Sequence, residues 1–272
     1  MPRLLLLVFC LASLGGASSD PWTALQPGLD LGVFDAPTRS DIGDSVIHVL
    51  RVDPERFDLV LLNASADPEL GNRTARDWAE TEELLAVINA SMYRMDHRTS
   101  VAHMERAGHV NNAGWSKDNA VLAFDPIDAD APRVTIIDNR CDDREVESKR
   151  YRTLVQSIRM LRCDGANVWS QQPKKWSHAV IGIDGAGRPL LIHARSPWST
   201  HDFIDLLRAL PIDLRRLQYA EGGPEASLYV KAGGTELDRF GSYETGFFES
   251  DDNDRAWPLP NVIGVRPVAA TR

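Results

Sequence analysis

Apolar residues recur along the chain in short runs, many of them alternating with polar residues, and this pattern predicts many strands. Residues 46–52 and 57–65 are two such runs, joined by a polar turn that contains Asp53. Residues 178–184 and 189–195 flank a Gly-Ala-Gly-Arg sequence that is typical of a hairpin. Further strand candidates are residues 120–125, 134–138, 154–161, 214–220, 226–232 and 261–268.

Two segments show helical patterns instead. Residues 72–88 predict a helix that Thr74 caps, because Asp77 follows three positions later. Residues 199–210 predict a second, amphipathic helix that ends before Pro211. The inward face of this second helix consists of Phe203, Leu206, Leu207 and Leu210.

The balance of these elements predicts the fold class. Many strands, hairpin-like joins and only two strong helices favour an α+β protein with a large, mostly antiparallel or mixed sheet system and a few flanking helices. No glycine-rich phosphate loop or Gly-x-Ser-x-Gly elbow occurs, so a doubly wound nucleotide-binding fold is not expected. Residues 20–272 contain no internal repeat or low-complexity linker, and we expect them to form a single domain.

The first residues predict export. Arg3 precedes an apolar run at residues 4–14, which is shorter than the ~20 residues that a membrane-spanning helix needs. Residues 1–19 are therefore interpreted as a secretory signal peptide, and the protein is expected in the periplasm or the extracellular space. Lipidation at Cys10 is the less favoured alternative, because Phe9 stands where a small residue is expected.

Charge and cysteine content narrow the function. The formal net charge of −9 argues against a nucleic-acid partner, because such surfaces need clustered cations. The exported chain would keep Cys141 and Cys163, which are most simply interpreted as one disulfide in an oxidising compartment, two buried thiols being the alternative.

Three histidines were considered as metal ligands. His97, His103 and His109 are six residues apart, which is neither a helical face nor the usual spacing of a zinc pair. A polar loop near the site is the preferred interpretation. We expect neither a metal nor a cofactor.

Polar residues interrupt three of the apolar runs. An unpaired polar group in a buried strand costs about 1–3 kcal/mol, so such groups need partners, and several together often line a cleft. Half-exposed antiparallel strands show the same alternation, so a solvated face is the alternative for each one alone. The interrupting residues are Asn89, Ser91, Tyr93, Gln156, Ser157, Arg159, Tyr219, Glu221, Glu225, Ser227 and Tyr229.

With these interruptions in place, the chain resembles the phosphodiester glycosidase domain family. The segments that carry the resemblance are, in order, VINASMY, LVQSIRML, WSHAVIGIDGAGRPLLIHA, STHDFIDLLRALP, LQYAEGGPEASLYV and WPLPNVIGV. They span roughly residues 40–268. The resemblance implies hydrolysis of a sugar phosphodiester at its anomeric bond, by an exported protein.

The family's motif residues carry over to matching positions of this chain. Two positions depart from the family: Glu221 stands where Asp is common, and His178 where Arg is common. An imidazole lacks the permanent fork of a guanidinium, which weakens a bidentate grip on phosphate and leaves Arg159 as a further cation. The matching residues are Asn89, Tyr93, Gln156, Ser157, Gly222 and Gly223.

These residues predict a division of roles. Glu221 is the first candidate for the carboxylate that stabilises an oxocarbenium-like state, and Glu225 is the second, a solvated turn residue being its alternative. The N–H groups of Gly222 and Gly223 suit an anion. Asn89, Gln156 and Ser157 are expected to hydrogen-bond the sugar, and His178 and Arg159 to bind the phosphate. Tyr93 is expected to contribute to substrate binding.

A different class of function is compatible with the same residues. The cleft would then hold a glycan or another anionic saccharide of the cell envelope without turnover. Loss of the family's Asp and Arg at residues 221 and 178 is the change that such a binding protein would show.

Overall fold

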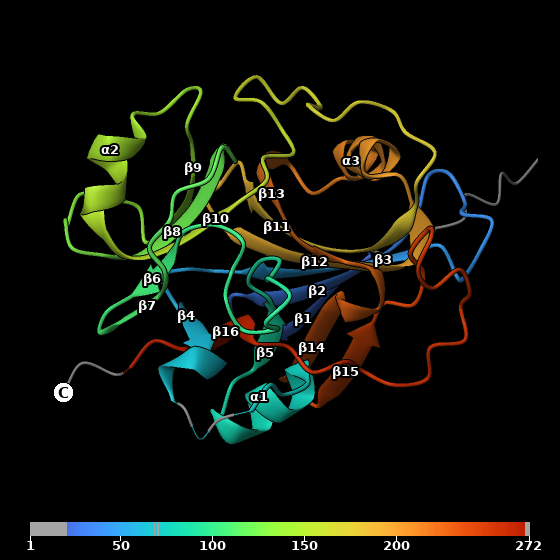
Figure 1. Ribbon diagram of the computed structural model, residues 1–272, viewed down its shortest axis with the longest axis horizontal. Helices are drawn as coiled ribbons and strands as arrows, with labels where there is room; N and C mark the ends of the chain where they lie inside the picture. The colour runs from blue at the N-terminus through green and yellow to red at the C-terminus, as the bar shows by residue number, and fades with distance from the viewer. Residues whose placement is uncertain (1–20, 68, 70, 270–272) are drawn as a thin grey trace, which may run out of the picture.

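The structure is a computed structural model that describes residues 21–269, except 68 and 70. The expected signal peptide at residues 1–19 therefore lies outside the described residues. The described chain forms three sheets in which every strand pair is antiparallel, with a few short helices around them (Figure 1). This arrangement confirms the α+β class. No helix of the described residues is long and apolar enough to cross a membrane.

The first sheet has six strands and contains the hairpin expected at the Gly-Ala-Gly-Arg sequence. That hairpin joins β11 to β12, and the two strands pair from Trp176 to Ile183. The strands lie in the spatial order β1 (Trp22–Gln26), β2 (Leu29–Asp35), β3 (Val46–Val52), β12 (Pro189–Trp198), β11 (Trp176–Asp184) and β13 (Leu214–Gly222).

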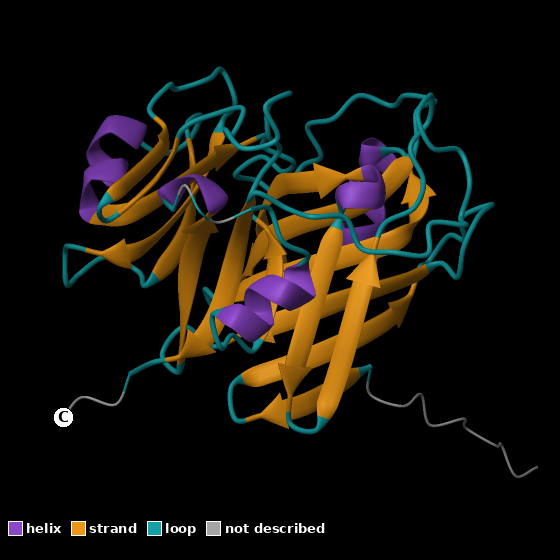
Figure 2. Ribbon diagram, turned by 60° about the horizontal axis from the view of Figure 1, so that its bottom comes forward, coloured by secondary structure: helices purple, strands orange, loops and turns teal. Residues whose placement is uncertain are grey.

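The other two sheets have five strands each. One has the spatial order β7 (His109–Asn112), β6 (Met104–Arg106), β10 (Tyr151–Ser157), β8 (Ala120–Pro126) and β9 (Val134–Asp138). The other has the order β15 (Thr235–Phe240), β14 (Ser227–Ala232), β5 (Ala86–Asn89), β16 (Asn261–Pro267) and β4 (Phe57–Asn63). Figure 2 shows the strands of the separate sheets crossing one another at an angle.

Three α-helices and three 3-10 turns complete the described chain. Thr74 forms a capping box with Asp77 at the start of α1, as the sequence predicts. This helix is shorter than expected, because residues from Ala86 onward pair with β14 and β16 instead. The helical elements are α1 (Ala75–Thr81), α2 (Arg144–Glu147), α3 (Thr200–Ala209), η1 (Ala64–Ala66), η2 (Ser148–Arg150) and η3 (Gly223–Glu225).

The two longest helices, α1 and α3, each cover the outer face of a sheet. The central core is formed by apolar residues from strands of all three sheets, among them Leu50, Leu122 and Leu228. On the outer face of the six-stranded sheet, Phe203 of α3 packs in a second cluster. Trp78 of α1 packs in a third cluster against strands of the β15–β4 sheet. Each fully buried large side chain contributes about 1.5–3 kcal/mol, so these clusters hold the sheets in place.

The end of β10 positions the site. The sequence predicts one strand over residues 154–161, but β10 ends at Ser157. The chain then leaves its sheet and follows β13, where the Tyr219 amide donates to the carbonyl of Ile158 and the Met160 amide to the carbonyl of Leu217, both over 3.0 Å. This crossing brings residues 158–161 beside the strand that carries Glu221.

Candidate functional site

The carboxyl end of β13 opens into a cavity of about 330 Å³, here called the acidic cavity. Three glutamates line it: Glu221 at the end of β13, Glu225 in η3 and Glu244 in the loop that follows β15. The remaining walls are mainly aromatic and apolar, and they include Tyr93, Trp176 and Tyr219.

Two glycines allow the chain to form this cavity. A Cβ atom on Gly222 would overlap the hydroxyl of Tyr219, so only glycine fits against that ring. Gly223 has φ of +66°, and a Cβ there would lie 2.6 Å from Oε2 of Glu244. The Gly-Gly pair therefore lets the backbone pass close to the tyrosine and the third glutamate.

Asn89 holds the backbone around Glu225 in place. The Asn89 amide donates to the carbonyl of Glu225 over 3.0 Å and accepts from the Ser227 amide over 2.7 Å. Both ends of the buried Asn89 side chain are thus bound to the backbone around Glu225. Tyr93 lines the same cavity, and its side chain opposes the rise in the pKa of Glu225 that burial causes.

Burial raises the pKa of all three carboxyl groups, and neighbouring carboxylates add to the rise for Glu221 and Glu225. Burial and the neighbouring Glu225 raise the pKa of Glu221 to about 8, although the amide of Gly222 donates to its carboxylate over 3.1 Å. Burial is also the main cause that raises the pKa values of Glu225 and Glu244. At neutral pH Glu221 is therefore mainly protonated and can donate a proton.

No lining residue of the acidic cavity in the described part of the chain is Lys, Arg or His. Lys174 lies outside the lining and opposes the rise in the pKa of Glu244, but the lining itself repels an anion whenever its glutamates are ionised. A protonated Glu221 lowers this repulsion. The cavity thus suits an uncharged portion of a substrate, such as a sugar ring, better than a phosphate group.

Asn89 and two other polar residues predicted on the sugar make structural contacts instead of lining the cavity. Ser157 is fully buried, and its hydroxyl donates to the carbonyl of Tyr219 over 2.5 Å. The fully buried Gln156 side chain accepts from the Ser116 amide over 2.9 Å and donates to the carbonyl of Asp118 over 2.7 Å. Neither residue lines the acidic cavity. Ser157 stabilises the position of β13, and Gln156 stabilises the loop at residues 116–118.

His178 lies under the sheet rather than in the cavity. It is fully buried, it stacks on Phe203 with ring centroids 4.3 Å apart, and its Nε2 atom is 3.2 Å from the Thr200 hydroxyl. Burial lowers the pKa of His178 to about 3, so the ring is neutral at physiological pH. A neutral, enclosed imidazole contributes no charge to a phosphate site, and we do not include His178 in the proposed site.

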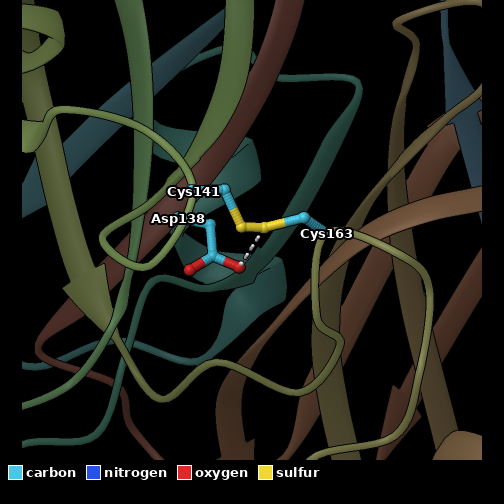
Figure 3. Close-up of side chains that lie close together, drawn as sticks. All are labelled: Asp138, Cys141 and Cys163. Atoms are coloured by element: carbon cyan, nitrogen blue, oxygen red, sulfur yellow. Dashed lines mark hydrogen bonds between the residues drawn. A yellow bond between two sulfur atoms is a disulfide. The ribbon is translucent and has the colours of Figure 1, made fainter.

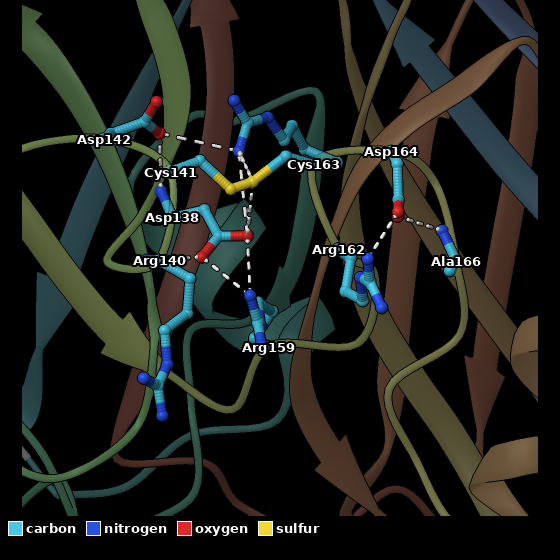
Figure 4. The surroundings of a disulfide bond; sticks show 10 residues. Asp138, Arg140, Cys141, Asp142, Arg159, Arg162, Cys163, Asp164 and Ala166 are labelled. Atoms are coloured by element: carbon cyan, nitrogen blue, oxygen red, sulfur yellow. Dashed lines mark hydrogen bonds and ion pairs between the residues drawn. A yellow bond between two sulfur atoms is a disulfide. The ribbon is translucent and has the colours of Figure 1, made fainter.

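Arg159 lines a second hollow of about 450 Å³, here called the Arg159 pocket. Its walls include Lys117, Asp118, Asn119, Arg159, Trp169 and Ser170. One terminal nitrogen of Arg159 lies 3.0 Å from Oδ1 of the buried Asp138. Figure 4 shows Arg159 reaching toward Asp138 beside the disulfide.

Cys141 and Cys163 form a disulfide that joins the turn after β9 to the segment after Leu161 (Figure 3). Asp138 lies beside it, with Oδ2 3.4 Å from the Cys163 sulfur. Among the described residues, Asp138 and the two cysteines form a group compact enough for a metal ion. Because the two sulfurs are bonded to each other, they are not available as thiolate ligands.

Besides the apolar Met92 and Val101, three lining residues are not among the predicted site residues. Glu244, Trp176 and Tyr219 all contribute to the acidic cavity. Tyr219 shares a strand face with Glu221 at period two, which is a usable signal. Glu244 is a single acid in a polar loop, and nothing local in the sequence distinguishes it.

Several carboxyl groups around one cavity are the arrangement that glycosidases use. The phosphodiester glycosidase family matches residues 82–266, and the chain belongs to this family. No curated protein sequence matches the chain.

Solved structures share the fold at low sequence identity. One is the zebrafish N-acetylglucosamine-1-phosphodiester alpha-N-acetylglucosaminidase catalytic domain, described as auto-inhibited by its pro-peptide, with a TM-score of 0.63 and 12% identity over 90% of this chain and 85% of that chain. Another is a hypothetical protein from Synechocystis, with a TM-score of 0.59 and 12% identity over 90% of this chain. This chain covers 63% of the Synechocystis chain, which is less than two thirds of its length.

Proposed function

We propose that the protein is an exported hydrolase that cleaves a sugar phosphodiester at the anomeric carbon–oxygen bond. The observation that carries the proposal is the acidic cavity, where Glu221 and Glu225 face one space in a chain of the phosphodiester glycosidase family. The sugar ring would occupy the cavity. Tyr93, Tyr219 and Trp176 would provide its apolar and aromatic walls.

The pKa values support separate roles for the two glutamates. Glu221, with a pKa raised to about 8, would act as the acid and give its proton to the departing phosphate oxygen. Glu225 would act in its ionised form and stabilise the positive charge that develops at the anomeric carbon. Water supplies the new anomeric hydroxyl, so the products are a free sugar and a phosphomonoester.

Asn89 would be a positioning residue in this scheme. Its amide binds the backbone on both sides of Ala226, at Glu225 and Ser227. It therefore acts on the substrate only through the placement of Glu225. The double hydrogen bond fixes η3 relative to β5, which a catalytic carboxylate requires.

The test is release of free sugar from a small panel of sugar 1-phosphodiesters by the purified protein. Glu221→Gln and Glu225→Gln should each lose turnover, because each removes an ionisable group of the cavity. Glu55→Gln is the matched control, since Glu55 is an exposed residue in the turn between β3 and β4. Equal turnover in all four proteins would show that the protein is a hydrolase but that neither glutamate is needed for catalysis.

The alternative function, saccharide binding without turnover, is a defined outcome of the same experiment. It would show as no sugar release from any diester while a saccharide still binds the wild-type protein. Glu221→Gln would then bind as well as the wild type, because a neutral Glu221 and a glutamine present similar hydrogen-bonding groups.

A further inference from the structure

The acidic cavity leaves part of a phosphodiester substrate without a partner. Three glutamates and no cation line the cavity, yet the leaving-group side of such a substrate carries at least one negative charge. A phosphate oxyanion is best held by cations and N–H donors. An inference about where such groups lie rests on the proposed function.

The Arg159 pocket offers these groups. Lys117 is exposed in its wall and makes no ion pair with another described residue. Arg159 adds a guanidinium that is paired with Asp138 and whose Nε atom is buried without a hydrogen-bond partner among the described residues. Asn119 and Ser170 supply uncharged side chains that can donate hydrogen bonds.

The two hollows are separated by one pair of aromatic rings. Trp169 lines the Arg159 pocket, Tyr219 lines the acidic cavity, and their ring centroids lie 5.9 Å apart. The backbones are joined as well, because the Tyr219 amide donates to the carbonyl of Ile158, which lines the Arg159 pocket. The Arg159 pocket is therefore a direct neighbour of the acidic cavity.

The walls of the pocket are held by buried contacts. Gln156 binds the backbone on both sides of Lys117, at Ser116 and Asp118. Asp138 orients Arg159, and the Asn139 amide donates to the carbonyl of Asn119 over 2.9 Å. A site whose charged groups are fixed in advance loses less entropy when an anion binds.

We infer that the Arg159 pocket is a subsite for a phosphate-type oxyanion on the leaving-group side of the substrate, with Lys117 as its principal cation. The oxyanion is either the scissile phosphate or a second acidic group further along the leaving group. In both cases the subsite explains why cationic residues lie beside the acidic cavity and not in it.

The test is direct titration with inorganic phosphate, followed by calorimetry and by tryptophan fluorescence. Lys117→Gln should weaken phosphate binding about tenfold, because one charge-assisted contact is lost. Lys149→Gln is the matched control, since Lys149 is exposed in η2 and does not line the pocket. Its affinity should equal that of the wild type. No phosphate binding by the wild type at millimolar concentrations, or equal binding by the Lys117 variant, would overturn the inference.

Kinetics then identify which oxyanion is bound, if the protein turns over. A raised KM of Lys117→Gln for every diester indicates the scissile phosphate. A raised KM only for diesters whose leaving group carries a second phosphate indicates the more distant group. The phosphate titration needs no turnover, so failure of the proposed hydrolysis and failure of the subsite are distinguishable.

Discussion

The acidic cavity and the Arg159 pocket lie on either side of one Trp–Tyr pair, but their charges are arranged in opposite ways. In the cavity, three glutamates face one another without a lining cation, and their pKa values rise. In the pocket, Arg159 is paired with the buried Asp138, and a disulfide lies next to that pair. Of the other charged residues that line the pocket, neither Lys117 nor Asp118 has an ion-pair partner among the described residues, and the Asp118 carboxylate accepts from the Ser116 hydroxyl.

The difference separates groups that serve reactivity from groups that serve structure. Uncompensated carboxyl groups destabilise a fold, and proteins keep them mainly where chemistry requires a shifted pKa. Paired and cross-linked groups hold a wall in place. We therefore expect substitutions in the cavity to change turnover and those around Asp138 to change stability.

Glu225→Gln tests the reactive side and should have the largest effect. Loss of a catalytic carboxylate is expected to lower kcat about 10²–10⁴-fold. The folded state should be unaffected or slightly more stable, because the pKa of Glu225 is already raised by burial. Steady-state sugar release measures the first effect and urea unfolding the second. A Glu225→Gln variant that is much less stable but keeps its turnover would show that Glu225 serves structure and not reactivity.

Removal of the disulfide tests the structural side. Replacing Cys141 and Cys163 together by serine opens a cross-link across 22 residues, which should lower the free energy of unfolding by about 3 kcal/mol. Urea unfolding of the oxidised wild type and the double variant measures the difference. Turnover per folded molecule on a simple diester should change far less than in Glu225→Gln. A large loss of turnover at unchanged stability would contradict the comparison.

The sequence predicts these two regions unequally well. The Gly222–Gly223 turn and its two flanking acids are visible because permissive and charged residues interrupt two apolar runs. Each of these four residues lines the cavity. Most strands were predicted for the same reason, since period-two patterns and turn residues are local signals.

Other features depend on contacts that no local pattern encodes. The sequence indicates that Gln156 and Ser157 need partners, but it does not indicate that these partners are backbone groups of Ser116, Asp118 and Tyr219. The strand over residues 154–161 ends early, because its second half pairs with the distant β13. Glu244 reaches the cavity from a separate loop. Tertiary contacts therefore decide which polar residues can bind a substrate and which stabilise the fold.

Glu221→Gln should stabilise the protein while it removes activity. A carboxyl with a pKa near 8 in the folded state and about 4.5 in the unfolded state binds more protons when folded. Stability from this group is therefore full below pH 4.5 and is lost as pH rises to about 8. Glutamine does not titrate, so at pH 8 the variant should be more stable by about 1–3 kcal/mol, partial exposure of the carboxyl reducing the effect.

The control for this variant is built into the pH dependence. At pH 4 both proteins carry an uncharged group at residue 221, and their free energies of unfolding should agree. Urea titrations at pH 4 and pH 8 measure both differences. A variant that is less stable at pH 8 would show that Glu221 is compensated by a contact that the cavity does not reveal.

The pH dependence of turnover follows from the same group. If protonated Glu221 is the acid, kcat/KM should fall above pH 8, by about tenfold for each further pH unit. Diester hydrolysis measured from pH 5 to pH 10 gives the profile, with unfolding checked by circular dichroism at each pH. A profile that stays flat through pH 9 would assign the acid to another group.

His178→Gln should have the smallest effect on phosphate affinity. It tests whether the sheet face that α3 covers takes part in phosphate binding. The ring is fully buried against Phe203 of α3, and its lowered pKa of about 3 leaves it neutral. Phosphate affinity of the folded variant should therefore stay within about twofold of the wild type, which is less than ~0.5 kcal/mol. Loss of the stacked ring should instead appear as a lower unfolding temperature. A buried neutral ring cannot attract phosphate across the sheet. A tenfold loss of phosphate affinity in the folded variant would therefore mean that phosphate binds near α3 and not at Lys117.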